Sequence, residues 1–192
     1  MSKRIAFFTA AAFGALALTA TVVAPVSAQD KMKSEMSGEK TVMVGGAAMF
    51  PSKNIIQNAV NSKDHTTLVA AVKAAGLVGT LEGKGPFTVF APTNAAFGKL
   101  PAGTVDTLVK PENKATLTKI LTYHVVAGKL EASDLTDGKK LKTVQGEELT
   151  VKRSGDTVMI IDAKGGSSTV TIPNVNQSNG VIHVVDTVLM PS

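Results

Sequence analysis

Apolar residues in the first half of the chain recur with the spacing of helices. Residues 54–60 and 66–75 repeat apolar positions three and four residues apart, which places them on one face of a helix. Gly76 follows the second run, as a glycine that ends a helix does. A further helix is predicted to begin at Pro111, because proline is favoured in the first turn. Its apolar face contains Leu117, Ile120, Leu121 and His124.

The second half has the residue pattern that is typical of short β-strands. Four runs of apolar and β-branched residues, separated by glycine-containing turns, cover residues 141–144, 148–152, 157–161 and 169–172. Two further runs, residues 87–90 and 181–185, have the composition of buried strands. Asn179-Gly180 before the last run predicts a tight turn. Helices followed by mostly antiparallel strands predict an α+β domain.

The residues after the 87–90 run indicate a change of structure. Ala91-Pro92 is predicted to stop the strand, because proline cannot donate a hydrogen bond to a sheet. Thr93 and Asn94 offer side-chain oxygens that can cap a short helix over residues 95–100.

The start of the chain has the three parts of a secretion signal. Lys3 and Arg4 are basic, residues 5–23 are apolar and rich in small side chains, and residues 26–28 (VSA) fit a cleavage site. A membrane anchor is the competing interpretation, since the apolar run approaches the ~20 residues that span a bilayer. Because small residues interrupt the run, we predict a signal peptide over residues 1–28. The product is then secreted or periplasmic, with no stable membrane anchor.

Residues 29–48 are polar, rich in methionine and without a sustained period. They are predicted to form a flexible N-terminal segment that precedes a single domain over residues 49–192. The thioethers of Met32, Met36 and Met43 are soft ligands that suit copper. Their irregular spacing and the lack of a neighbouring histidine favour a linker.

Composition excludes several classes of function. The chain has no cysteine, so disulfides, thiolate metal sites and cysteine nucleophiles are ruled out. Its formal charge is +5, and removing Lys3 and Arg4 leaves 18 basic residues against 15 acidic ones, a balance of +3. The basic residues are scattered, and one tyrosine with no tryptophan provides no stacking platform. We therefore predict no nucleic-acid binding.

The three histidines do not have the spacing of metal ligands. His124 lies on an apolar helical face and His183 in an apolar strand, so both are predicted to be core residues that bond backbone carbonyls. His65 stands near a predicted helix start and is expected to be solvated. The sequence has neither a G-x-S-x-G nucleophile elbow nor a Walker loop. We predict no catalytic residue, no metal and no cofactor.

Three segments together resemble the signatures of fasciclin domains. The first is TVFAPTNAAF, residues 88–97; the second is Tyr123-His124 with Val125-Val126; the third is NGVIHVVD, residues 179–186, with residues 189–191. They stand in the family's order, and the match covers roughly residues 54–191. The signature residues of the first and third segments are Thr88, Phe90, Ala91, Pro92, Thr93, Asn94, Phe97, Gly180, Val181, Ile182, His183 and Asp186.

The resemblance implies a fasciclin-like fold, in which helices pack along a small bent antiparallel β-sandwich. It also implies an exported, non-enzymatic module for cell adhesion or matrix interaction, with an extracellular or envelope protein or glycan as partner. The motif residues that it offers for binding are Tyr123, His124, Val125 and Val126. Their apolar surroundings favour a place in the core. Animal members carry an Asp-Ile integrin motif before the third segment, whereas residues 175–178 read VNQS.

Small-ligand binding is the alternative function. A lipid, a glycan or an aromatic metabolite would occupy a groove between the helices and the sandwich, where binding sites of this kind form. Leu117, Leu121 and Phe97 are the candidate lining residues, although core packing explains them equally well.

Overall fold

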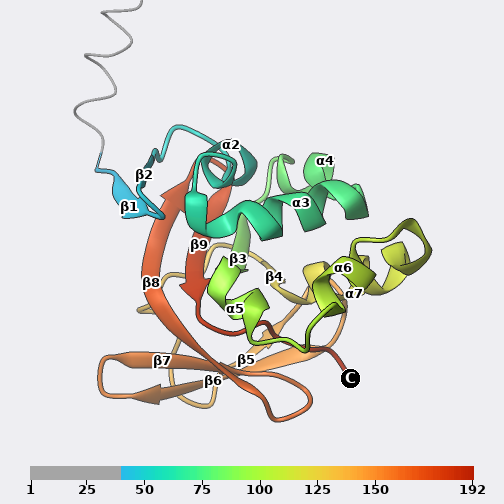
Figure 1. Ribbon diagram of the computed structural model, residues 1–192. Helices are drawn as coiled ribbons and strands as arrows, with labels where there is room; N and C mark the ends of the chain where they lie inside the picture. Colours follow the sequence, from blue (N-terminus) through green and yellow to red (C-terminus); the bar gives the residue numbers. More distant parts are fainter. Residues whose placement is uncertain (1–39) are drawn as a thin grey trace, which may run out of the picture.

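The helices and strands lie in residues 40–192, which are the part of the chain that the computed structural model describes (Figure 1). The signal peptide and Met32 and Met36 lie outside these residues. The helical segments are α2 (Ile55–Ala59), η1 (Lys63–His65), α3 (Thr66–Ala75), α4 (Val78–Leu81), α5 (Asn94–Gly98), α6 (Thr104–Leu108), η2 (Pro111–Asn113) and α7 (Lys114–Tyr123). The strands are β1 (Val42–Val44), β2 (Ala47–Met49), β3 (Phe87–Pro92), β4 (Val125–Ala127), β5 (Lys140–Lys142), β6 (Glu148–Ser154), β7 (Thr157–Ile161), β8 (Ser167–Gln177) and β9 (Gly180–Val185).

The predicted helices are present, with ends that follow local capping. Asn54 caps α2 and forms a reciprocal pair of hydrogen bonds with Gln57. The α3 helix covers the predicted 66–75 range and ends at Gly76, whose φ of 74° is left-handed. Pro111 opens a 3₁₀ turn that leads into α7, so the helix predicted there starts in two steps.

Seven strands form one sheet in the order β4-β3-β9-β8-β7-β6-β5. The β8 strand is long and has two irregularities in its register with β9, which let it pair with β9 along one part and with β7 along another. The outer ends of the sheet also meet: Val126 bridges Thr143, and the Val144 N–H donates to the Val125 carbonyl at 2.7 Å. This contact protects the edge strands from pairing with other chains.

Strands β3 and β9 are parallel, with Phe87 opposite Gly180 and Pro92 opposite Val185. The neighbouring pairs on either side are antiparallel. The α+β prediction is confirmed, but the sandwich that was expected to be antiparallel is a mixed sheet. The strand also continues through Ala91 and Pro92, where it was predicted to stop. Proline is tolerated as the last residue because Thr93, one position later, donates to the Val185 carbonyl at 3.3 Å.

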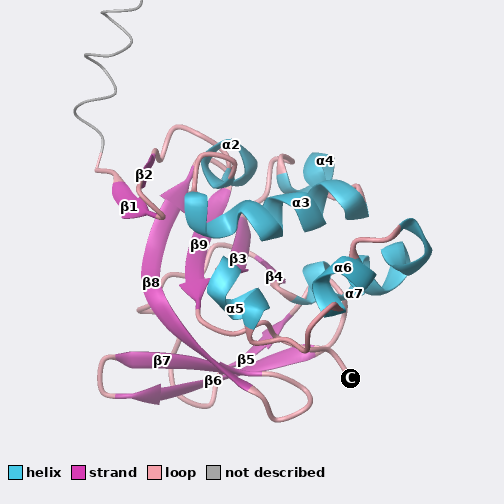
Figure 2. Ribbon diagram, viewed as in Figure 1, coloured by secondary structure: helices cyan, strands magenta, loops and turns pink. Residues whose placement is uncertain are grey.

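The β3–β9 pair is buried on both faces. Figure 2 shows the helices along one side of these strands and β5 to β7 on the other. The cluster on the helix side contains Val89, Ala91, Ile182 and Val184 from the pair. The cluster on the sandwich side contains Phe90 and Val185, with Tyr123 and apolar residues of β5 to β7. Burial on two faces explains why both strands are apolar in sequence.

Residues 42–49 form a two-stranded hairpin, β1 and β2. Val44 and Met49 are buried in the cluster on the helix side. The segment 29–48 was predicted to be flexible, and its last residues instead belong to the ordered domain. No periodic pattern predicts this hairpin, because its strands have three residues each and gain their stability from tertiary contacts.

We expect Gly180→Ala to destabilise the domain by about 2–4 kcal/mol. A Cβ atom at this position would lie 2.0 Å from the carbonyl oxygen of Phe87, so β3 and β9 would have to separate. Gly98→Ala is the control, because a Cβ there meets nothing within 4 Å. Urea unfolding of both variants measures the effect. Equal stability of the two would contradict the close approach of the strands.

Candidate functional site

The first signature segment organises the backbone around β3. Thr93 caps α5 by accepting a hydrogen bond from the Ala96 N–H at 3.2 Å, as predicted. Asn94 has a different role from the one expected. Its Oδ1 atom accepts from the Thr67 N–H at 3.0 Å, and its Nδ2 atom donates to the Lys63 carbonyl at 2.8 Å. Asn94 therefore ties α5 to the start of α3.

Thr88 and Phe97 of the same segment are also structural. The Thr88 hydroxyl donates to the Gly128 carbonyl at 2.6 Å and accepts from the Leu130 N–H at 2.8 Å, which fixes the chain after β4. Phe97 is buried in the helix-side cluster.

Tyr123 and His124 are almost fully buried at the end of α7. The Tyr123 hydroxyl accepts from the Ala163 N–H at 2.8 Å and donates to the Glu148 carbonyl at 3.4 Å. Burial raises the pKa of this hydroxyl, against the hydrogen bond from Ala163. The side chains of this pair, like those of Val125 and Val126, have no exposed surface to offer a macromolecular partner.

His124 connects its own helix to the C-terminal segment. Its Nδ1 atom is 2.8 Å from the Ile120 carbonyl, and its Nε2 atom accepts from the Leu189 N–H at 3.0 Å. A ring that accepts at one nitrogen must be neutral. Burial lowers the pKa of His124 to about 4, although the Ile120 carbonyl and Asp162 oppose the shift.

His183 uses the same arrangement on β9. Its Nε2 atom is 2.8 Å from the Leu130 carbonyl, and its Nδ1 atom accepts from the Asn174 N–H at 3.4 Å. Asn174 has a left-handed φ of 57° and lies in one of the two register irregularities of β8. Burial lowers the pKa of His183, and its ring stacks on Phe90. The prediction that His124 and His183 are core residues bonded to backbone carbonyls is confirmed.

Asp162 is a structural residue that the sequence analysis did not single out. Its Oδ1 atom accepts from the N–H groups of Lys164 and Gly166, and its Oδ2 atom accepts from the Met190 N–H at 3.0 Å. It thus joins the β7–β8 turn to the C-terminal signature beside Tyr123. The glycines at 165 and 166 were the available signal, because an aspartate before glycines favours such a turn.

Asp186 is the last residue of the 179–186 part of the third signature segment, and it lies at the surface. It accepts from the Thr169 N–H at 2.8 Å and lies 3.5 Å from the Lys99 ammonium. Burial would raise the pKa of this carboxyl, but the hydrogen bonds from Thr169 and Thr187 and the charge of Lys99 hold it below its ordinary value. The same segment also forms most of β9, in which Gly180, Val181 and Ile182 are buried.

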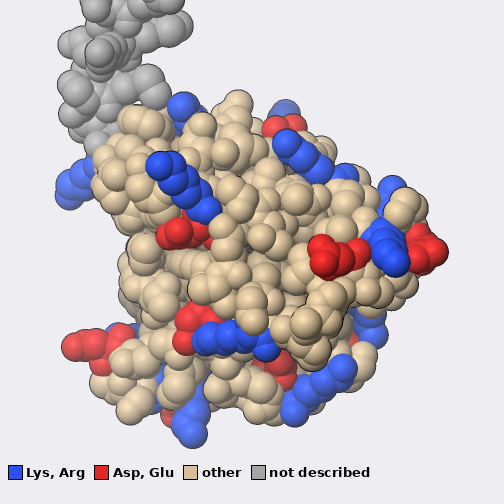
Figure 3. Space-filling view, viewed as in Figure 1, with Lys and Arg blue, Asp and Glu red and all other residues tan. Residues whose placement is uncertain are grey.

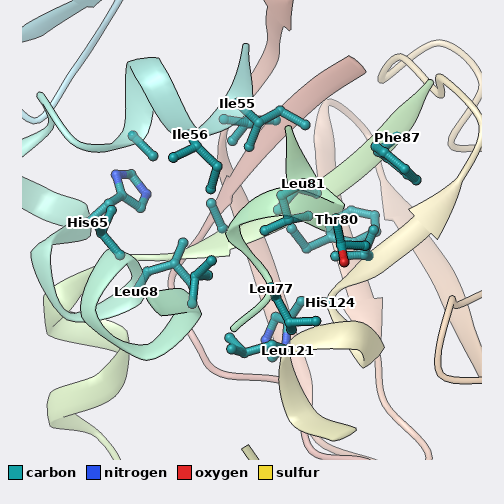
Figure 4. Close-up of a pocket in the computed structure, with 18 of the residues that line it drawn as sticks. Ile55, Ile56, His65, Leu68, Leu77, Thr80, Leu81, Phe87, Leu121 and His124 are labelled. Carbon is teal, nitrogen blue, oxygen red and sulfur yellow. The ribbon is translucent and has the colours of Figure 1, made fainter. Parts of the chain in front are cut away.

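An apolar pocket of about 50 Å³ lies where the helices meet β3 and β9 (Figure 4). Its walls come from helices α2, α3, α4 and α7 and, to a similar extent, from strands, of which β3 contributes four residues. Of the three lining residues predicted for a ligand site, Leu121 lines this pocket, whereas Leu117 and Phe97 are buried in the same helix-side cluster without lining it. His124 of the motif also borders the pocket.

His65 lines the same pocket and was wrongly expected to be solvated. Only 3% of its surface is exposed, and η1, the turn that contains it, packs against α3 and α5. Its Nδ1 atom is 2.9 Å from the Ser62 hydroxyl, and its Nε2 atom has no hydrogen-bond partner among residues 40–192. Burial lowers the pKa of this ring, against the Ala91 carbonyl and the charge of Asp64.

Neither a metal-binding cluster nor a membrane-spanning helix is present in the described residues. Within residues 40–192, no group of three or more His, Cys, Asp or Glu side chains stands close enough to hold a metal ion. Over the same residues, the helices are too short or too polar to cross a membrane.

Fold and site together define a small α+β module with a closed sheet, structural signature side chains and an apolar pocket on its helical side. The sequence model of the fasciclin domain matches residues 63–191. Protein sll1483 of Synechocystis sp. is 45% identical over 190 residues, which cover 99% of this chain and 97% of that relative. The chain belongs to the fasciclin domain family.

Two further relatives have informative descriptions. Cell surface glycolipoprotein MPB83 of Mycobacterium bovis is 41% identical over 153 residues, which are 77% of this chain and 64% of that protein. A solved FAS1 domain pair from the insect cell adhesion molecule Fasciclin I matches 73% of this chain with a TM-score of 0.65. This chain spans about half of that pair, 52%, and at 19% identity the likeness shows the fold alone.

We expect the free energy of unfolding to fall as the pH decreases from about 6.5 to about 4. Unfolded His124 takes up a proton near its ordinary pKa of 6.5, whereas the folded residue stays neutral down to about 4. Between these values the unfolded state binds more protons, so acid favours unfolding. For His124 the full loss is about 3 kcal/mol. The lowered pKa values of His65 and His183 act in the same direction.

Urea unfolding between pH 7.5 and pH 4 measures this dependence. His124→Gln is expected to be less stable at neutral pH and to lose less stability on acidification, because one titrating group is gone. A variant with the same pH slope as the wild type would rule out His124 as a source of the effect.

Proposed function

We propose that this chain is an exported, non-enzymatic module that binds macromolecules of the cell envelope or the extracellular matrix. The secretion signal predicted over residues 1–28 supports export. The descriptions of two relatives support the location and the activity, since one is a cell surface protein and the other a cell adhesion molecule. A glycan or a protein is the partner in this proposal.

The exposed surface of α3 and α5 is the observation that carries the proposal. Ala70 and Ala74 of α3 and Ala95 and Gly98 of α5 are exposed, small and uncharged. The two helices are in contact with each other. Figure 3 shows few charged side chains in the middle of this face, over α3 and α5, and lysines and acidic residues around it. Centres of protein interfaces are depleted of charge in the same way.

The burial of the Tyr123-His124 motif supports the same assignment. Both side chains are occupied by backbone hydrogen bonds, and neither is exposed. If binding depends on this motif, it does so because the motif maintains the folded shape of the domain. Exposed residues on another part of the surface make the contact.

We expect the double substitution Ala70→Glu with Ala95→Glu to weaken binding at least tenfold, because two charges would have to be desolvated at the interface. Both positions are exposed, so the fold is preserved. Retention of the mature chain on immobilised envelope and matrix fractions measures binding.

Ser154→Glu is the matched control, since Ser154 is exposed on β6 in the other part of the sheet. Tyr123→Phe, checked for folding by circular dichroism, is expected to bind like the wild type. Unchanged retention of the double variant would refute the α3–α5 surface. If a folded Tyr123→Phe chain is no longer retained, the Tyr123-His124 motif is part of the binding interface after all.

We propose small-ligand binding as a second function, and the pocket is the observation that favours it. Its walls are apolar, and it opens to solvent where its lining residues are exposed, as Thr80 and Val144 (45% accessible) are. An apolar cavity favours an apolar guest, because water inside it finds few hydrogen-bond partners. A lipid segment suits these walls better than a glycan, whose hydroxyl groups would lack partners.

We expect xenon, an apolar atom that suits a cavity of this size, to bind the wild-type chain, and Val144→Arg to weaken that binding at least fivefold by blocking the opening. Val60→Arg is the matched control, because Val60 is 48% exposed and does not line the pocket. The chemical shift of the ¹²⁹Xe signal in a titration reports binding. If the wild-type chain leaves the signal unchanged, the small-ligand proposal is refuted, and the adhesion proposal is unaffected.

A further inference from the structure

The charges of this protein are divided unevenly between its two parts. Residues 40–128, which contain the described helices and the strands β1 to β4, have nine lysines against four acidic residues, a balance of +5. Residues 129–192 have seven basic residues against eight acidic ones, a balance of −1. Such an asymmetry indicates a surface that attracts anionic partners. The pocket is lined mostly by residues of the basic part.

Two lysines lie close to α4, which forms one wall of the pocket. Thr80 of α4 is exposed, and Figure 4 shows it at the same side of the pocket as Phe87. Lys84 is exposed in the short connection between these two lining residues. Lys114 approaches the start of α4, because its Nζ atom lies 3.4 Å from the position that a Cβ atom on Gly76 would take.

The charges of these lysines are not used within the domain. Lys73, which is exposed on α3, forms no ion pair with any residue of the described range 40–192, and the same is true of Lys84 and Lys114. Figure 3 shows basic side chains over α3 and α4. The three ammonium groups are therefore available to a negatively charged partner.

Few acidic groups oppose this positive charge. Glu82 is the only acidic residue in the segment 65–105. Glu112, near Lys114 in the sequence, lies 3.9 Å from the ammonium group of Lys110. The surroundings of α4 therefore keep a positive balance at the side where the pocket opens.

The inside of the pocket, by contrast, accepts only a narrow apolar group. Its polar side chains are engaged by the protein: the Thr122 hydroxyl donates to the Thr118 carbonyl at 2.7 Å, and both ring nitrogens of His124 are bonded. Its volume of about 50 Å³ is a third of the cavity of about 150 Å³ that holds benzene in another protein. A chain of methylene groups fits this space better than a ring, and its polar head has to stay at the opening.

We propose that the pocket binds the end of an unbranched alkyl chain with an anionic head group, which Lys73, Lys84 and Lys114 attract at the opening beside α4. This inference rests on the second function proposed above, and it names the ligand class and the residues that select it. The carboxylate of a fatty acid and the phosphate of a membrane lipid share the required chemistry.

Three compounds with eight carbon atoms test the proposal on the wild-type chain at pH 7.5 and low salt. Octanoate has an unbranched chain and a negative head, 2-propylpentanoate is its branched isomer, and octylammonium has the same unbranched chain with a positive head. Displacement of xenon, followed by the ¹²⁹Xe shift, gives the dissociation constants. We expect octanoate to bind at least fivefold more tightly than its isomer. We also expect it to bind about tenfold more tightly than octylammonium, and salt reduces this second ratio by screening.

Lys73→Glu combined with Lys84→Glu is expected to abolish or reverse the preference for octanoate over octylammonium and to leave the preference over the branched isomer unchanged. Lys152→Glu with Lys164→Glu is the matched control, because both lysines are exposed, neither lines the pocket and the net charge changes equally. An equal loss of preference in the control would overturn the role of the lysines around α4.

Equal affinities of the wild-type chain for octanoate and octylammonium, or for the two isomers, would overturn the proposal. If xenon binds in those cases, the second function stands and only the ligand class is wrong. If xenon does not bind, both fail together. Sedimentation with phosphatidylglycerol vesicles, but not with phosphatidylcholine vesicles, would support a membrane lipid as the source of the chain. Displacement of xenon by octanoate without vesicle binding would support a free amphiphile.

Discussion

The structure depends on the parallel pairing of β3 with β9, two strands that are far apart in the chain and buried on both faces. Their backbones come so close at Phe87 and Gly180 that there is no space for a side chain at position 180. The helices pack on one face of this pair, and the rest of the sheet curls over the other. Every signature segment of the family either forms these strands or holds a neighbouring segment against them.

Buried neutral histidines also hold this fold together, through hydrogen bonds to backbone groups. His124 and His183 each place one ring nitrogen against a backbone carbonyl and the other against a backbone N–H. A ring can satisfy a donor and an acceptor of irregular backbone in this way, deep in the protein, as long as it stays uncharged. His65 has the same burial but only one partner.

Much of the fold was predictable because its local signals agree with its tertiary environment. The α3 helix, its terminal glycine and the β7 strand have the predicted ranges. The β1–β2 hairpin was not predictable, since three-residue strands have no period of their own. In the pocket, Leu121 was identified from its helical face, but Leu117 on the same face packs elsewhere. Periodicity assigns a residue to a face and does not say which cavity that face borders.

Residue types alone decided that this chain has no thiol chemistry, that it has buried β3 and β9 strands and that it carries fasciclin signatures, because these are local properties of composition and spacing. The tertiary structure decided the parallel register, the role of Asn94 and Asp162 as links between distant segments, and the burial of His65. Each of these depends on partners many residues away. A local sequence pattern does not identify the distant segments that a residue will contact.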